Sequence, residues 1–142
     1  MDRMTRAMIQ MECQQLLNRA TQLMDNNQWH ELVELYTEDG VLFRPSDPNN
    51  GVHGKQAILE SFLSRPPKTT CHALLNSVID IQQEDLVVVT SRVWLVSGPA
   101  SEGGAVNSEG PLLVGGFVDT LVYSDGRWLI KQRKGSLELK HA

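Results

Sequence analysis

The chain has 142 residues, of which 41% are hydrophobic and 21% charged, a composition typical of an ordinary globular domain with a core of its own. Its formal net charge of −4 gives no reason to expect nucleic acid as a partner, and no apolar run approaches the roughly 20 residues that a membrane-spanning helix needs. The N-terminus lacks the apolar segment of a secretion signal, so we expect one cytoplasmic domain over residues 1–142.

Helical periodicity dominates the first 65 residues. Apolar side chains between Ile9 and Met24 recur at steps of three and four, which predicts a long amphipathic helix with one buried stripe. The polar residues 25–27 interrupt this helix, because short polar side chains favour caps over helix interiors. The expected elements are helices at 5–24, 28–36 and 54–65, a strand at 41–44 and a loop at 45–51.

The second half of the chain favours strands. β-branched and aromatic residues fill four segments, and the short polar turns between most of them favour antiparallel pairing. Gly115 and Gly116 predict a bend or bulge in mid-strand, and small residues make 98–110 a candidate for disorder or a mobile flap. The expected strands are 69–81, 86–96, 112–124 and 127–135.

Three helices followed by a run of strands predict an α+β fold. The helices would pack on one face of a strongly curved, mostly antiparallel sheet, and the concave side would enclose an interior cavity. The polar segment 134–142 is expected either to close this pocket or to fray.

Few residues carry an obvious chemical signature. The four histidines form no HxH or HExxH spacing, and no phosphate-binding or nucleotide-binding glycine motif is present. We therefore expect no metal and no cofactor, so an enzyme of this sequence would work with its side chains alone. Cys13 and Cys71 have no CxxC spacing and are predicted to be buried free thiols in a reducing compartment rather than a disulfide.

His72 lies in the first of the long predicted strands. The period of two places it on one strand face together with Thr70, Leu74, Asn76 and Val78. A histidine among apolar neighbours is more often a structural residue with a satisfied hydrogen bond than a catalyst. Its position alone therefore favours the structural interpretation.

Two acids stand beside apolar residues. Asp119 shares its predicted strand face with Phe117, and an acid in such surroundings is either ion-paired or perturbed in its pKa. Arg92 and Lys131, from neighbouring strands, are candidate partners for it. Asp25 precedes the second predicted helix and is a candidate N-cap for that helix.

Four stretches carry a resemblance to a known family: "MDNNQWHELVELYTEDGVLF", "GKQAILESFL", "CHALLNSVIDI" and "GGFVDTLVYSDGRWLIKQR". Together they resemble the SnoaL-like branch of the nuclear-transport-factor-2-like superfamily over nearly the whole chain. The resemblance implies a cone-shaped α+β barrel, in which three N-terminal helices and a curved sheet surround an apolar pocket.

Among these proteins the chain looks most like the scytalone dehydratase and dehydrochlorinase types. In those enzymes an aspartate four residues before a tryptophan pairs with a histidine on the following long strand. Asp25 stands four residues before Trp29, and His72 opens the matching strand, so the resemblance implies an Asp25–His72 catalytic pair. It also implies a pocket-facing role for Asp119. Met24 stands where the dehydratase has a tyrosine.

The expected function is that of a cofactor-independent lyase, isomerase or cyclase acting on a small apolar or aromatic molecule. His72 would be the base that abstracts a proton, and Asp25 would orient its ring and stabilise the imidazolium. The expected substrate-binding residues are Met24, Phe43, Asn76, Trp94, Phe117 and Asp119.

Two other functions stay open at this point. One is a non-catalytic domain for small-molecule binding or subunit interaction, and the other is a structural partner of a larger oxygenase. The family commonly pairs two subunits through the outer face of the sheet, and apolar residues on both faces of the later strands, such as 87–89, agree with that. We therefore expect a homodimer.

Overall fold

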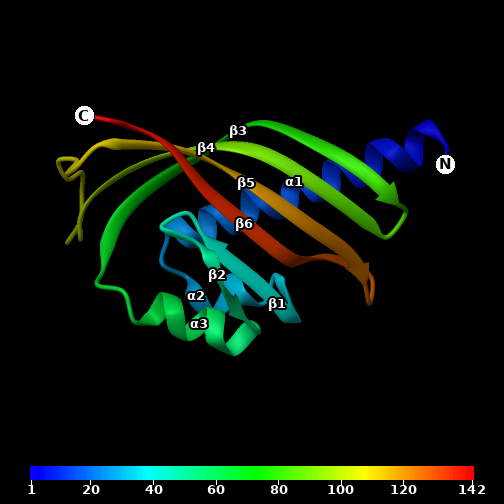
Figure 1. Cartoon of the computed structure of the whole chain (residues 1–142), viewed down its shortest axis with the longest axis horizontal. Coiled ribbons are helices and arrows are strands. Elements are labelled where there is room, and N and C mark those ends of the chain that lie inside the picture. Colours follow the sequence, from blue (N-terminus) through cyan, green and yellow to red (C-terminus); the bar gives the residue numbers. More distant parts are fainter.

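Figure 1 shows a computed structural model of the chain, which describes all residues from 1 to 142. The helices are α1 (Arg3–Asp25), α2 (Trp29–Val33) and α3 (Lys55–Leu63). The strands are β1 (Tyr36–Arg44), β2 (Asp47–His53), β3 (Lys68–Gln83), β4 (Leu86–Pro99), β5 (Leu112–Ser124) and β6 (Arg127–His141). No helix is both long and apolar enough to span a membrane.

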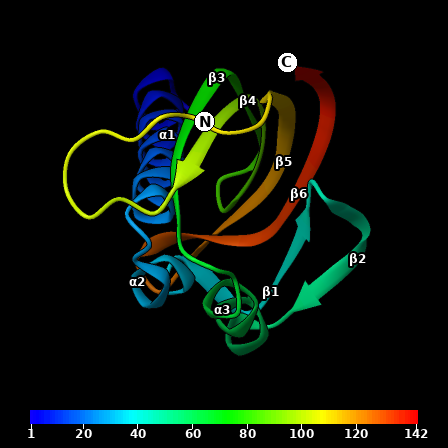
Figure 2. The ribbon, with the colours of Figure 1, turned by 90° about the vertical axis from the view of Figure 1, so that its left-hand side faces the viewer.

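The six strands form one mixed sheet in the order β2-β1-β6-β5-β4-β3. All neighbouring strands are antiparallel except β1 and β6, which run parallel. The sheet curves strongly, with α1 along its concave side and α2 and α3 closing one end (Figure 2). The predicted α+β class, with N-terminal helices packed on a curved sheet, is confirmed.

Helix α1 supplies the longest apolar stripe of the core. Its first turn is capped by Asp2, whose Oδ1 accepts a hydrogen bond from the backbone N–H of Thr5 at 2.7 Å. Asn27 just beyond it has a φ of 56°, a left-handed conformation that turns the chain out of the helix. The buried residues of α1, which pack against inward-facing residues of the strands, are Ile9, Cys13, Leu17, Ala20 and Leu23.

The second helix is shorter than predicted. It ends at Val33, and by Tyr36 the chain has entered β1, whose residue Tyr36 pairs with Ile130 of β6. The backbone N–H of Ile130 donates to the carbonyl of Leu35 at 2.8 Å. Pairing with a strand that lies far away in the sequence thus overrides the local helical pattern.

Two predictions about irregular segments were wrong. Most of the expected loop at 45–51 belongs to β2, an edge strand that pairs with β1. Of the two alternatives for 134–142, the fray was wrong, because the segment is the end of β6 and stays paired with β5 as far as Leu112 and His141. The segment 100–111 has no regular structure, and its mobility stays a prediction.

The two cysteines differ in exposure. Cys13 is buried as predicted, whereas Cys71 is exposed, and both are free thiols. The prediction of a buried Cys71 was wrong because β3 is an edge strand, and the side chain of Cys71 alternates with the inward-facing Thr70 and His72.

Bulges interrupt two of the long strands. In β3, Leu75 pairs with Arg92 and Val78 with Thr90, so β3 carries one residue more than β4 between these pairs. In β6, Glu138 is an extra residue between the pairs Val114–Leu139 and Gly115–Leu137, so the irregularity lies at the glycine pair as predicted, although the bulged residue belongs to β6. Such bulges increase the local bend and twist of a sheet.

Candidate active site

Asp25 and His72 form a hydrogen-bonded pair. Asp25 is the last residue of α1, and His72 lies on β3, against which α1 packs. Nδ1 of His72 lies 2.5 Å from Oδ1 of Asp25, and the backbone N–H of His72 donates to Oδ2 at 2.9 Å. Thr70 Oγ1 donates to Oδ1 at 2.9 Å. The carboxylate is therefore committed to β3 and does not cap α2, whose N-cap residue Gln28 makes no side-chain capping bond.

The surroundings of Asp25 keep it ionised. Burial alone would raise the pKa of its carboxyl, but hydrogen bonds from the side chain and backbone of His72, the charge of that ring and the bond from Thr70 together lower it. An ionised carboxylate can only accept, so Nδ1 of His72 carries the proton of this hydrogen bond. When the ring is neutral, Nε2 carries the free lone pair.

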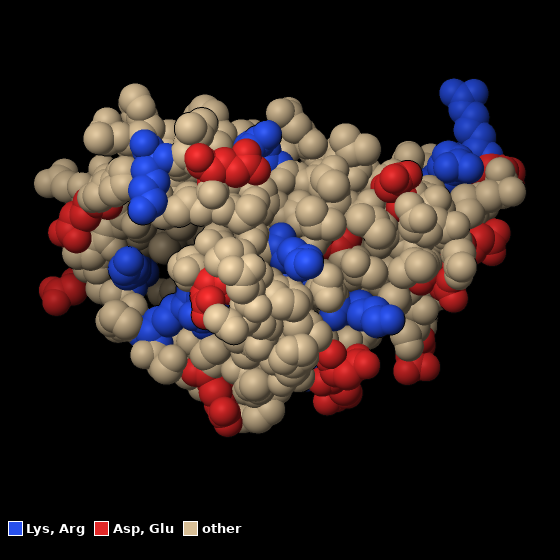
Figure 3. Space-filling model, in the orientation of Figure 1, with Lys and Arg blue, Asp and Glu red and all other residues tan.

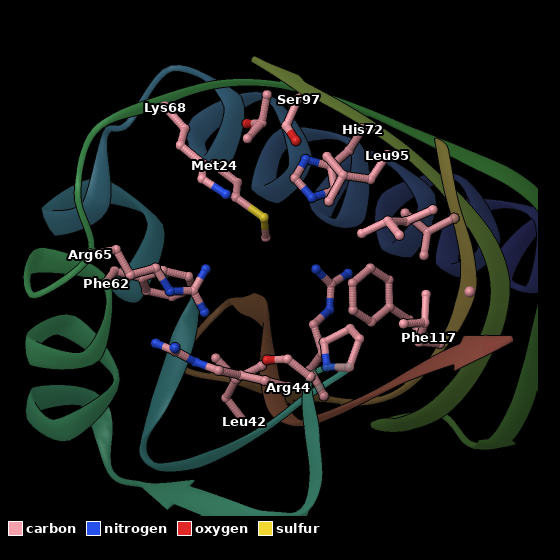
Figure 4. Close-up of a pocket in the computed structure, with 18 of the residues that line it drawn as sticks. Met24, Leu42, Arg44, Phe62, Arg65, Lys68, His72, Leu95, Ser97 and Phe117 are labelled. Carbon is pink, nitrogen blue, oxygen red and sulfur yellow. The ribbon is translucent and has the colours of Figure 1, made fainter. Parts of the chain in front are cut away.

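His72 forms part of the wall of a cavity of about 700 Å³, a volume within the range of small-molecule sites. Figure 4 shows Met24, Phe62, Leu95 and Phe117 around the same space as His72. A hollow opens on the face drawn at the left of Figure 3, and Lys and Arg atoms border it. The apolar part of the wall includes Met24, Trp29, Leu42, Phe62, Val93, Leu95, Leu113 and Phe117.

The charged part of the wall is entirely cationic. Four basic side chains line the cavity, namely Arg44, Arg65, Lys68 and Arg133, and no Asp or Glu does. The protein as a whole carries a net charge of −4. The interior surface of the cavity therefore has the opposite sign to the molecule.

Asp119 lies behind the cavity wall rather than on it. It is fully buried, and its two carboxylate oxygens accept hydrogen bonds from Nε and Nη2 of Arg133 at 2.7 and 3.1 Å. Burial alone would lower the pKa of Arg133, but the charge and hydrogen bonds of Asp119 raise it. The expected partners were wrong: Arg92 pairs with Glu138, and Lys131 is exposed.

Two of the six expected substrate-binding residues, Met24 and Phe117, line the cavity. Trp94 does not, because the even-numbered positions of β4 point to the outer face of the sheet. Phe43 does not either; it packs on the outside of β1, where Nζ of Lys134 lies 5.2 Å from its ring centroid. The expectation that these two aromatic residues form cavity walls was wrong.

Because of the bulge in β3, Asn76 does not face the cavity. Asn76 has a φ of 54°, and the extra residue at this point reverses the alternation of the strand. His72 therefore faces the interior while Asn76 faces solvent, and the inward position passes to Ser77, whose Oγ lies 2.9 Å from that of Ser91. The prediction that His72 and Asn76 share a face was wrong.

None of the four cationic wall residues, Arg44, Arg65, Lys68 and Arg133, was anticipated from the sequence. Arg44 follows Leu42 by two positions on β1, so strand alternation alone predicts that both face the interior. Arg133 lies opposite Asp119 in the β5–β6 register. Arg65 follows the end of α3 and has no comparable signal in the sequence.

A profile of the SnoaL-like domain matches residues 6–134. The chain belongs to the SnoaL-like family. No curated protein matches it by sequence. Among solved structures it is similar to a scytalone dehydratase-like protein from Novosphingobium aromaticivorans, with 25% identity and a TM-score of 0.79 over 96% of this chain and 88% of that one.

Two further structures share the fold of this SnoaL-like protein. ActVI-ORFA from Streptomyces coelicolor is 18% identical, with a TM-score of 0.74 over 92% of this chain and 97% of that one. The β subunit of benzoate 1,2-dioxygenase from Burkholderia mallei is 19% identical, with a TM-score of 0.70 over 89% and 88%. The same fold occurs in a scytalone dehydratase-like protein and in a dioxygenase β subunit, so the fold alone does not determine an activity.

Proposed function

We propose that this SnoaL-like protein is a cofactor-independent enzyme that abstracts a proton from a small apolar or aromatic substrate, in a lyase, isomerase or cyclase reaction. The observation that carries the proposal is the Asp25–His72 pair at the wall of the cavity. The similarity to the scytalone dehydratase-like protein supports the same class of chemistry.

In the proposed reaction the neutral ring of His72 is the general base. Its Nε2 takes a proton from a substrate carbon, and Asp25 stabilises the imidazolium that results. In a lyase reaction the electron pair of the broken C–H bond forms a double bond, and a hydroxide or halide leaves the neighbouring carbon. The imidazolium then returns its proton to the leaving hydroxide or to water.

Arg133 is placed to stabilise negative charge that develops on the substrate. It lines the cavity, and its Nε and Nη2 are occupied by Asp119, which leaves Nη1 free of that pair. A fixed guanidinium in a shielded site stabilises a developing anion more than water does, because its dipoles and charge need no reorganisation. We assign Arg133 this electrostatic role and Asp119 the role of holding it in position.

The test uses a panel of hydroxylated and halogenated rings in D2O, with deuterium incorporation and loss of the leaving group followed by NMR. We expect His72→Asn to lower the rate by at least about a hundredfold, as is usual for loss of a general base. His30→Asn, at an exposed position, is the matched control. A rate that is unchanged in His72→Asn would contradict the proposal.

A second candidate function is small-molecule binding without chemistry. The observation in its favour is the lack of phenolic donors: neither of the two tyrosines, Tyr36 and Tyr123, lines the cavity. Mass spectrometry of the natively purified protein distinguishes the two functions. A pure ligand that is retained and recovered unaltered, with no turnover of the panel, would favour binding alone.

We further propose that the protein acts in the cytoplasm as a homodimer. The two free thiols suit a reducing compartment. The outer face of the sheet exposes several large apolar side chains, namely Val78, Trp94, Val96 and Val118. A patch of this kind on one sheet face is typical of a surface that pairs with another subunit.

A further inference from the structure

Three of the four cationic wall residues have no acidic partner in the protein. Arg133 is paired with Asp119, but Arg44, Arg65 and Lys68 form no salt bridge. Asp47 lies opposite Arg44 in the β1–β2 register, yet its carboxylate accepts a hydrogen bond from Asn50. The two arginines are thus free to bind something that the protein itself does not supply.

Two of the hydrogen-bond donor atoms of Arg44 have no partner in the protein. Its Nε and Nη2 atoms are shielded, and no group of the protein is a hydrogen-bond partner for them. A buried donor without a partner costs free energy, and a charged one costs more. Burial also lowers the pKa of Arg44. The ring of Phe62 lies near this guanidinium, but no protein group accepts a hydrogen bond from its Nε or Nη2.

Arg65, which is partly exposed to solvent, adds a second positive charge beside the same aromatic ring. The guanidinium carbons of Arg44 and Arg65 lie 5.5 and 5.0 Å from the ring centroid of Phe62. Phe62 is itself stacked on Trp29, with the two ring centroids 4.7 Å apart. Burial and the nearby charge of Arg44 lower the pKa of Arg65 to about 10. Two like charges gathered without a counterion are typical of an anion-binding site.

We propose that Arg44 and Arg65 form an anion site that holds a carboxylate of the substrate. The claim deepens the proposed function, on which it rests for the role of His72, by adding that the small apolar or aromatic substrate carries an acid group. Guanidinium groups bind carboxylates through paired N–H donors, and such charge-assisted bonds are stronger than neutral ones.

A carboxylate suits the site better than a phosphate. Protein sites for phosphate commonly use the N-terminus of a helix, where free N–H groups converge. Arg65 instead follows the C-terminal end of α3, where carbonyl groups carry the negative end of the helix dipole. That end opposes a doubly charged group more strongly than a singly charged one.

The anion site and the proposed base face each other across the cavity. In Figure 4, Arg65 lies beside Phe62 at the left and Arg44 lies at the bottom near Leu42, whereas His72 and Leu95 lie at the upper right. Met24 projects into the space between them. A flat substrate with its carboxylate at the arginine pair would therefore present its other end to His72.

Binding measurements test the anion site without any turnover. The probes are benzoate and 2-naphthoate, each compared by calorimetry with the uncharged amide of the same shape. We expect the carboxylates to bind the wild-type protein at least about tenfold more tightly than the amides. We expect Arg44→Gln and Arg65→Gln to remove that preference while leaving amide binding unchanged.

The control is Arg127→Gln, which removes an exposed arginine outside the cavity and should leave carboxylate binding unchanged. Arg44→Lys and Arg65→Lys keep the charge and should retain part of the preference. Equal affinity for acid and amide, no binding of either carboxylate at millimolar concentration, or an equal loss in Arg127→Gln would overturn the proposal.

The same titration on His72→Asn separates this proposal from the proposed catalysis. If the carboxylate preference persists there, the anion site stands whether or not the protein is an enzyme. If the preference is lost in His72→Asn but kept in Arg44→Gln and Arg65→Gln, the anion is held by His72 and the arginine site is wrong.

Discussion

Arg133 and Asp119 form a doubly hydrogen-bonded ion pair in the interior, with side chains that are 1% and 0% exposed. The pair joins neighbouring strands β5 and β6, and the guanidinium carbon of Arg133 lies 4.0 Å from the ring centroid of Phe117. One residue of the pair is thus hidden in the core while the other forms part of the cavity wall.

Removing one partner of this ion pair should destabilise the protein much more than replacing both partners with apolar residues. We expect Asp119→Ala to lower the free energy of unfolding by about 3–5 kcal/mol, because it leaves the buried charge of Arg133 without its partner. The double variant Asp119→Leu with Arg133→Met should be more stable than Asp119→Ala. Urea unfolding followed by circular dichroism measures both, and equal losses in the two variants would show that the charge is not the cause.

The pH dependence of the free energy of unfolding should show the contribution of the ionised Asp25. Its pKa is lowered in the folded protein, so its contribution to stability is complete above the unfolded value of about 3.9 and is lost as the pH falls through the folded value. We expect Asp25→Asn to be less stable than wild type at neutral pH, with the gap closing in acid. Asp80→Asn, at an exposed position, is the control. A gap of constant size from neutral pH to below pH 3 would contradict the assignment.

Gly115 should tolerate no side chain. A Cβ at this position would lie 1.9 Å from the carbonyl oxygen of Ser136, so the β5–β6 bulge would have to open. We expect Gly115→Ala to destabilise the protein by about 1–3 kcal/mol or more. At Gly116 the closest atom, the oxygen of Ser91, would be 3.1 Å away, which makes Gly116→Ala the milder comparison. Thermal unfolding of the two variants in parallel gives the difference, and equal melting temperatures would contradict the steric account.

Trp94 should report on the proposed dimer. Its side chain is exposed on the outer face of the sheet, and a charge placed there would be desolvated if two copies pack through that face. We expect Trp94→Glu to shift the mass measured by light scattering from a dimer to a monomer. Glu84→Lys, at an exposed polar turn, should leave the dimer intact. A monomeric wild-type protein, or a dimer unaffected by Trp94→Glu, would rule out this interface.

Local patterns predict the long elements of this fold well. The expected strand at 112–124 matches β5 (Leu112–Ser124) at both ends, and the helix expected at 5–24 lies within α1. Both elements have a long, regular apolar pattern that packing in the fold does not overrule. Tyr36 is different, because its place in β1 depends on pairing with Ile130, almost a hundred residues later in the chain.

The candidate site could be anticipated only in part. The resemblance to a family predicts that Asp25 and His72 form a pair, and the two side chains are in hydrogen-bond contact in the structure. Their catalytic role stays a proposal. The outward position of Asn76 could not be foreseen, since a bulge depends on how two strands pair and leaves little trace in composition. Arg44 was missed although its spacing from Leu42 indicates the cavity face.

The extra residue in β3 changes which positions of the strand face the interior. Before it, even-numbered residues such as His72 face the interior, and after it odd-numbered residues such as Ile79 and Ile81 do. Strict alternation over the same residues, without the bulge, would turn one end of the strand inside out and put Asp80 on the face of His72. Deleting Asn76 would instead remove the bulge and keep His72, Ile79 and Ile81 on the interior face. The bulge and the number of residues between His72 and Ile79 are therefore matched, and neither can change alone if both side chains are to stay inside.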